Sequence, residues 1–267
     1  MRPFLGLYVQ QFKTTLAMML QYRAALLIWT IGQVLEPLIY LIVWSVVSNG
    51  SGGSVGTYTT AEFAAYYVVL MLVNQISYTW IMYDFEYRVR EGTLSATLLR
   101  PVHPIHSDIA DNLSSKLITL PIIIVVAIGL AIGFHAPISP PSWAVPVFIL
   151  SLALAFLVRF LLEWTLALAA FWTTRVDAIN QAYFVLMLFL SGQIAPLSLL
   201  PQPLQVISYV LPFRWLIGFP IELVLGRLTA TQALVGLGAQ AGWLILSFVI
   251  MRTVWRAGVH VYTAVGA

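Results

Sequence analysis

Charged side chains are scarce in this chain, so those present are the first candidates for chemistry. Only 9% of the 267 residues are charged, whereas 60% are hydrophobic. The segment EYRVREGTLSATLLRPVHPI, residues 86–105, carries both signs of charge. Three further ions, Glu36, Arg159 and Glu163, lie within long apolar stretches. These two groups are the candidates for partner binding, ion-coupled transport or catalysis.

The three isolated ions should face protein or water, because a charge at the centre of a bilayer costs about 3 kcal/mol. Arg159 and Glu163 are four residues apart, so they can pair on one face of a helix. This spacing allows a purely structural ion pair. It also allows a site on a translocation route or subunit contact shared with Glu36, which precedes a potentially kinking Pro37. An alternative function follows, a proton- or sodium-driven transporter that uses Glu36 and Glu163, although the two halves show no convincing inverted repeat.

Enzymatic chemistry is poorly supported. The chain has no Cys, which excludes thiol nucleophiles and Cys-ligated metals. It has no G-x-x-x-x-G-K-[ST] motif for nucleotide phosphates and no H-E-x-x-H motif for zinc. One cluster of titratable residues could serve an enzyme acting on lipid, but its position favours a solvated loop: His103, His106, Asp108 and Asp111. We expect no catalytic residue, metal or cofactor in this chain.

Apolar windows long enough to cross a bilayer recur along the sequence. About 20 apolar residues span the hydrocarbon core as a helix. The windows predict an all-α membrane protein with six transmembrane helices in one domain, residues 24–267. The six spans are 24–47, 61–83, 117–134, 143–172, 179–194 and 233–254. Uninterrupted helices are expected, because lipid cannot satisfy free backbone groups.

Lys and Arg predict the orientation of these spans. Six crossings place the following basic residues on one side: Arg2, Lys13, Arg23, Arg88, Arg90, Arg100, Lys116, Arg175, Arg252 and Arg256. The opposite loops, residues 49–60 and 135–142, contain neither Lys nor Arg. The positive-inside rule therefore places both termini in the cytoplasm. The net charge of +3 then reflects contact with anionic membrane lipids, and nucleic acid is not an expected partner.

Two further segments are predicted at the membrane surfaces. In residues 1–23, apolar side chains recur at helical spacing opposite polar ones, which indicates an amphipathic helix on the inner surface. Residues 195–230 are apolar but contain five prolines, which is too many for one spanning helix. This second segment is predicted to re-enter the outer leaflet as short helices.

Two segments are informative together: REGTLSATLLRPVHPI after the second span and SGQIAPLSLLPQPLQVISYVLPFRW after the fifth. With these segments, the chain resembles the permease subunits of ABC-2-type transporters. The resemblance covers essentially the whole chain. It implies an exporter of hydrophobic or amphipathic substrates in the cytoplasmic membrane. It also implies two separate ATPase subunits, which hold ATP and Mg, and a second permease subunit, identical or homologous.

The resemblance further implies that the cytoplasmic segment 84–116 contains a coupling helix that docks into the ATPase. A helix over residues 91–99 would place Leu94, Leu98 and Leu99 on one side, ringed by ions, as protein interfaces favour. Gly92 allows a left-handed turn at its start. The expected docking residues are Arg88, Arg90, Glu91, Gly92, Leu94, Leu98, Leu99, Arg100 and Pro101.

Overall fold

The computed structural model describes residues 2–173 and 176–262, with side chains from residue 6 onward. Arg175, one of the charges used for orientation, lies outside the described residues. Helices dominate this part of the chain, and its only strands are β1 (Ser54–Val55) and β2 (Tyr58–Thr59), which form a short antiparallel hairpin. The prediction of an all-α membrane protein is confirmed.

The helical elements follow one another in this order: α1 (Arg2–Gln21), α2 (Arg23–Gly50), α3 (Thr60–Ser77), α4 (Ile81–Arg90), α5 (Leu94–Leu98), α6 (Pro104–Gly133), α7 (Ala144–Ala167), the 3-10 helix η1 (Leu168–Phe171), α8 (Asp177–Leu190), the 3-10 helix η2 (Leu197–Leu199), α9 (Gln202–Val210), α10 (Phe213–Leu216), α11 (Gly218–Val224) and α12 (Ala230–Val261).

Four helices are long and apolar enough to cross a membrane: α2, α6, α7 continued by η1, and α12. The other two predicted spans are shorter, 18 residues in α3 and 14 in α8. At 1.5 Å per residue these helices are about 27 and 21 Å long, less than the roughly 30 Å of a hydrocarbon core. Six complete crossings therefore remain a prediction.

The helix expected over residues 61–83 is interrupted, which corrects the prediction of an unbroken span. α3 ends at Ser77, and α4 begins only at Ile81. In the gap, the Tyr78 carbonyl accepts a hydrogen bond from Lys116, and the Thr79 hydroxyl donates to Glu163. Lys116 of α6 thus satisfies a backbone carbonyl that the helix no longer satisfies, and Glu163 of α7 fixes the Thr79 side chain; such contacts make a break tolerable inside a membrane protein.

The segment 84–116 is mostly helix and not an open loop. It contains most of α4, all of α5 and the first turns of α6. α6 begins at Pro104, where proline suits a first helical turn, and the His103 side chain accepts a hydrogen bond from the Ile105 amide at 3.3 Å. The span expected at residues 117–134 is therefore only the apolar part of a 30-residue helix.

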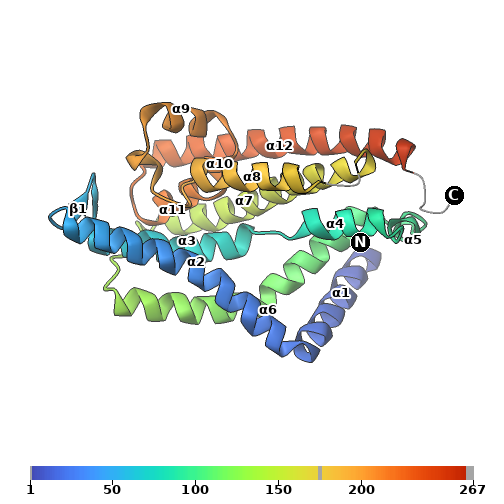
Figure 1. Cartoon of the computed structure of the whole chain (residues 1–267), viewed down its shortest axis with the longest axis horizontal. Coiled ribbons are helices and arrows are strands. Elements are labelled where there is room, and N and C mark those ends of the chain that lie inside the picture. The colour runs from blue at the N-terminus through green and yellow to red at the C-terminus, as the bar shows by residue number, and fades with distance from the viewer. Residues whose placement is uncertain (1, 174–175, 263–267) are drawn as a thin grey trace.

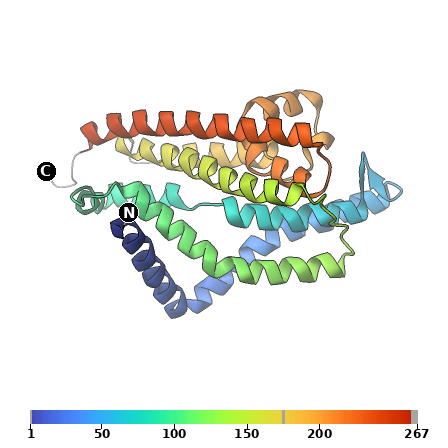
Figure 2. The same ribbon diagram turned by 180° about the vertical axis from the view of Figure 1, so that it is seen from behind.

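The helices form an elongated bundle around α7, the most buried of the four long apolar helices. α7 contacts α3, α4, α11 and α12, while α2 lies against α3 and α1 against α6. Figure 1 shows the strand hairpin and α9 toward one end of the bundle, and α5 with the last turns of α12 at the other. In Figure 2, α1 and α2 meet at a sharp bend, with α6 alongside α1.

The chain leaves α8 through an irregular turn that is held by aromatic side chains from other helices. Tyr66 of α3 donates to the Gly192 carbonyl at 2.6 Å. Tyr67 of α3 and Trp44 of α2 both donate to the Ile194 carbonyl at 2.8 Å. Gly192 has a φ of 91°, which a residue with a side chain rarely adopts. The short elements η2, α9, α10 and α11 follow this turn.

Candidate functional site

α5 does not present its leucines on one side, which corrects the predicted docking face. Leu94 is fully buried in the main hydrophobic core, and Leu98 is half-buried against it. Leu99, directly after the helix, has 88% of its surface exposed. The helix is only five residues long, and Gly92, with a φ of 71°, makes the turn before it. Leu94 therefore anchors α5, and Leu99 is free to meet a partner.

The charges around α5 also divide into two groups. The guanidinium of Arg88 forms a 3.0 Å ion pair with Asp108, which also accepts a hydrogen bond from Trp164 at 2.9 Å. Arg88 thus joins α4 to α6 and does not face outward as expected. The remaining predicted residues are exposed and define what we call the docking surface: Arg90, Glu91, Leu99, Arg100 and Pro101.

Tyr262, the residue that follows α12, supports α5. The hydroxyls of Ser95 and Tyr262 lie 3.0 Å apart, within hydrogen-bonding distance. The Tyr262 ring also packs against Phe171, with ring centroids 5.7 Å apart. α5 is therefore fixed to the bundle through Leu94, Ser95 and the residue that follows α12.

The titratable cluster considered for an enzyme does not converge on one point. Asp108 binds Arg88 and Trp164, whereas Asp111 accepts hydrogen bonds from Thr15 at 2.8 Å and Gln11 at 3.3 Å, both on α1. His103 packs against the rings of Trp164 and Trp255. Within the described ranges, no three His, Cys, Asp or Glu residues are grouped to hold a metal ion. The two carboxylates therefore join helices, and nothing in their geometry resembles an acid–base pair.

His103 should make stability depend on pH. Burial lowers the pKa of this imidazole below its usual value near 6.5, with a smaller contribution from His106. The unfolded chain then binds more protons than the folded chain as pH falls through about 6.5, so stability should decrease toward acid. His103→Phe keeps an aromatic ring and should flatten the thermal stability profile between about pH 5 and 7. His260→Phe, at an exposed site, should leave the slope unchanged; an unaltered slope in His103→Phe would contradict this assignment.

The predicted pair of Arg159 and Glu163 is confirmed. The Arg159 Nε and Glu163 Oε1 atoms lie 2.7 Å apart, and the side chains are only 3% and 0% exposed. Tyr183 of α8 also donates to Glu163, at 3.0 Å. Arg159 is satisfied further by Asn74 and Ser77 of α3, at 3.0 and 3.1 Å.

This buried ion network connects α3, α7, α8 and the break that follows α3. Thr79 of the break donates to Glu163, and Lys116 donates to the neighbouring Tyr78 carbonyl. Glu36 is not among the contacts of the network; it accepts a hydrogen bond from Gln193 at 2.7 Å and lies 3.5 Å from the Tyr40 hydroxyl. Glu36 therefore ties α2 to the turn after α8.

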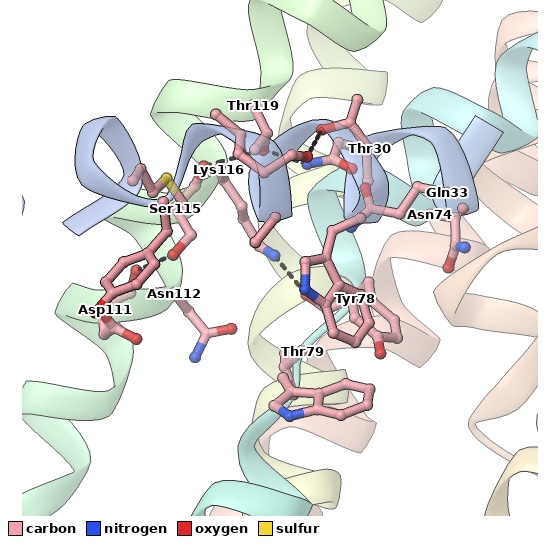
Figure 3. A pocket seen from close by; sticks show the side chains of 18 of the residues that line it. Thr30, Gln33, Asn74, Tyr78, Thr79, Asp111, Asn112, Ser115, Lys116 and Thr119 are labelled. Atoms are coloured by element: carbon pink, nitrogen blue, oxygen red, sulfur yellow. Dashed lines mark hydrogen bonds between the residues drawn. The ribbon is translucent and has the colours of Figure 1, made fainter. Parts of the chain in front are cut away.

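A cavity of about 680 Å³ lies beside the break in the α3–α4 segment (Figure 3). Its walls come from the end of α1, the first half of α2, the end of α3, the break, the first turn of α4 and the polar part of α6. Glu36, Asp84, Asp111 and Lys116 are the charged residues that line it. The volume lies within the 300–1,000 Å³ range typical of small-molecule sites.

Comparison with known proteins decides the family. A family model described as ABC-2 family transporter protein matches residues 34–266. The chain belongs to this family. No curated protein matches it. The match runs from the middle of α2 to beyond the end of α12, so it includes α5, the buried ion network and most of the cavity wall.

Membership identifies this ABC-2 protein as a transmembrane subunit of an ABC transporter, in a family whose members carry no ATPase domain of their own. The sequence predicted the ion pair of the ABC-2 protein, which the structure confirms, but not its cavity; ATPase docking at residues 88–101 stays a prediction. A signal was present in α6, where polar residues recur at helical spacing ahead of the apolar run: Asp108, Asp111, Asn112, Ser115, Lys116 and Thr119.

Proposed function

We propose that the chain is the permease subunit of an ATP-driven exporter of hydrophobic or amphipathic substrates in the cytoplasmic membrane. Segment 84–116 couples it to a separate ATPase subunit. The observation that carries this proposal is α5, where Leu94 is buried while Leu99 and Arg100 remain exposed. A short element fastened to the core, with an apolar side chain and ions outside, suits a contact that must transmit force.

The proposed assembly has two such permeases, identical or homologous, and two ATPase subunits that hold ATP and Mg. Six crossings and cytoplasmic termini belong to the same proposal. They are supported by the arrangement in Figure 1, where α5 and the last turns of α12 lie at one end of the bundle and the strand hairpin at the other. The shared end carries the basic residues of α4 and of the end of α12, as the positive-inside rule requires.

The coupling path begins at the docking surface and ends at the cavity. α5 follows α4 closely, and the ion pair of Arg88 with Asp108 joins α4 to α6. α4 in turn begins directly after the break at residues 78–80, which borders the cavity. Movement of the ATPase would shift α4 and thereby reshape the cavity. Energy enters only if the ATPase binds the two states of the permease with different affinity.

The alternative of an ion-driven transporter predicts spans interrupted at mid-membrane. The α3–α4 segment is interrupted, but its break follows a helix of about 27 Å, which reaches nearly across the hydrocarbon core and not only to its middle. We therefore place the break near the inner end of the span. Glu163 is already bound to Arg159, Thr79 and Tyr183, which leaves it poorly suited to carry an exchangeable ion.

Isolation of the chain in mild detergent from its native membranes tests the proposal. We expect a P-loop ATPase to co-purify in an equimolar amount, because the family is associated with ABC ATPase subunits and the proposed docking surface is exposed. The partner would be identified by mass spectrometry and its ATP hydrolysis measured in the complex. Reproducible absence of an ATPase, with the permease folded, would contradict the proposal and favour the ion-driven alternative.

A further inference from the structure

The cavity beside the α3–α4 break has an aromatic side. Trp29 of α2 and Trp80 of the break meet edge to face, with ring centroids 5.5 Å apart, and both line the cavity. Tyr78 also lines it, but the Arg159 guanidinium already lies 5.3 Å from the centroid of the Tyr78 ring. Tyr83 stacks on Trp80 with ring centroids 4.5 Å apart, so Trp29 and the remaining face of Trp80 are the aromatic surface left for a ligand. The faces of Trp and Tyr rings attract cations, and quaternary ammonium groups are commonly bound among such rings.

The charged groups of the cavity are mainly acidic. Glu36, Asp84 and Asp111 line it, and none of the three forms an ion pair with a basic side chain in the part of the chain that the structure describes. Glu36 and Asp111 are held by uncharged donors, Gln193 for the first and Thr15 and Gln11 for the second. Hydrogen bonds from neutral donors leave the negative charge of a carboxylate uncompensated.

Lys116 is the one basic residue among those lining the cavity, and its ammonium is already engaged. It donates to the Tyr78 carbonyl, as the dashed line in Figure 3 shows, and lies 5.4 Å from the centroid of the Phe156 ring. Lys116 therefore serves the helix break. Its single positive charge does not offset the three carboxylates, so the cavity as a whole does not favour an anion.

A buried acceptor without a partner adds to this negative character. Gln75 lines the cavity with only 7% of its surface exposed. Its amide nitrogen donates to Thr119 at 2.6 Å, whereas its carbonyl oxygen has no hydrogen-bond partner. A buried acceptor left unpaired costs about 1–3 kcal/mol, so a ligand that supplies positive charge or a donor would relieve that cost.

We propose that this cavity binds an organic cation carried on an apolar body, such as a lipophilic quaternary ammonium or phosphonium ion. Trp29 and Trp80 would contact the apolar body and the cation, and Asp84 and Asp111 would supply opposite charge. The substrate of the proposed exporter then belongs to the lipophilic cations. The claim that such cations are transported rests on the proposed function, whereas their binding to the cavity does not, because binding needs no ATPase.

The test compares two ions of nearly the same shape and opposite charge, tetraphenylphosphonium and tetraphenylborate. Each is titrated separately into the full chain in nanodiscs without choline lipids, and binding to empty nanodiscs is subtracted. We expect saturable binding of the cation only. Asp84→Asn should weaken it about tenfold, because a nearby opposite charge is removed. Trp80→Leu should weaken it about fivefold, through loss of the cation–π contact.

The control variant is Asp177→Asn, which removes an exposed carboxylate outside the cavity and should leave binding unchanged. Asp84 is also exposed at its position, so Asp84→Asn should fold even if Trp80→Leu does not. Equal binding of the two ions, or full binding by Asp84→Asn, would overturn the inference. These results stand whether or not an ATPase co-purifies, so failure here is distinguishable from failure of the proposed function.

Repeating the titration in nanodiscs that contain choline lipids distinguishes two possible natural ligands with a positively charged group, a free lipophilic cation and a lipid head group. Unchanged binding of tetraphenylphosphonium supports a free lipophilic cation as the natural ligand. Binding that is lost in proportion to the choline lipid supports recognition of the quaternary ammonium group and assigns the site to a lipid head group.

Discussion

Leu99→Asp should abolish co-purification of the ATPase and leave the helical bundle folded. Leu99 is 88% exposed next to α5, so the folded permease loses almost no internal contact on substitution. At the interface, a carboxylate without a partner would replace the central apolar contact. Changes at such central positions cost 2 kcal/mol or more, so binding should fall at least about thirtyfold. The measurement is the amount of ATPase retained on the purified permease, together with ATP-dependent transport.

Two companion variants separate docking from folding. Leu99→Met preserves an apolar side chain and should retain the ATPase. Leu94→Asp places a charge at a fully buried position and should lower the yield of folded permease in detergent. Retention of a full amount of ATPase by Leu99→Asp would remove Leu99 from the docking surface, and an undiminished yield of Leu94→Asp would contradict its role as the anchor of α5.

Glu163→Leu should be among the most destabilising single changes in the chain. It leaves the Arg159 guanidinium buried beside Asn74 and Ser77 without its counter-charge. Removal of one partner of a buried ion pair typically costs about 3–5 kcal/mol. We expect a large decrease in the thermal unfolding temperature of the detergent-solubilised permease.

The double variant Arg159→Met with Glu163→Leu tests whether the pair is structural or functional. Both charges are then gone, and stability should recover most of the loss, because apolar replacements of buried ion pairs are often neutral. Recovery of both stability and transport would identify the pair as structural. Recovery of stability with transport still absent would show that the charges take part in the transport cycle. A double variant as unstable as Glu163→Leu would show that the loss of stability does not come from leaving the Arg159 charge unpaired.

Long apolar helices were predictable because their signal is local. The predicted spans 24–47 and 233–254 lie inside α2 and α12, and the i, i+4 spacing was enough to pair Arg159 with Glu163. The break at residues 78–80 was not predictable in this way. It depends on side chains contributed by α6 and α7, which only the folded structure brings to the Tyr78 carbonyl and the Thr79 hydroxyl.

The candidate site was only partly predictable from the sequence, because it too depends on contacts between distant residues. α5 was predicted over residues 91–99 with its leucines together, but a helix of five residues does not keep one face over that length. The partner of Glu36 is Gln193, which is 157 residues away and follows a different helix. The cavity was missed because its polar wall belongs to the first half of α6, which an apolar window excludes.

The turn after α8 implies an order of assembly during synthesis. The carbonyls of Gly192 and Ile194 are satisfied by Tyr66, Tyr67 and Trp44, side chains that leave the ribosome more than 120 residues earlier. Until α2 and α3 are in place, these two carbonyls lack the side-chain donors that replace water in the folded bundle. α8 is also too short to be recognised as a span by itself. We therefore expect α8 and the turn after it to reach their final positions only against α2 and α3 that are already assembled, which makes the early helices a scaffold for the late ones.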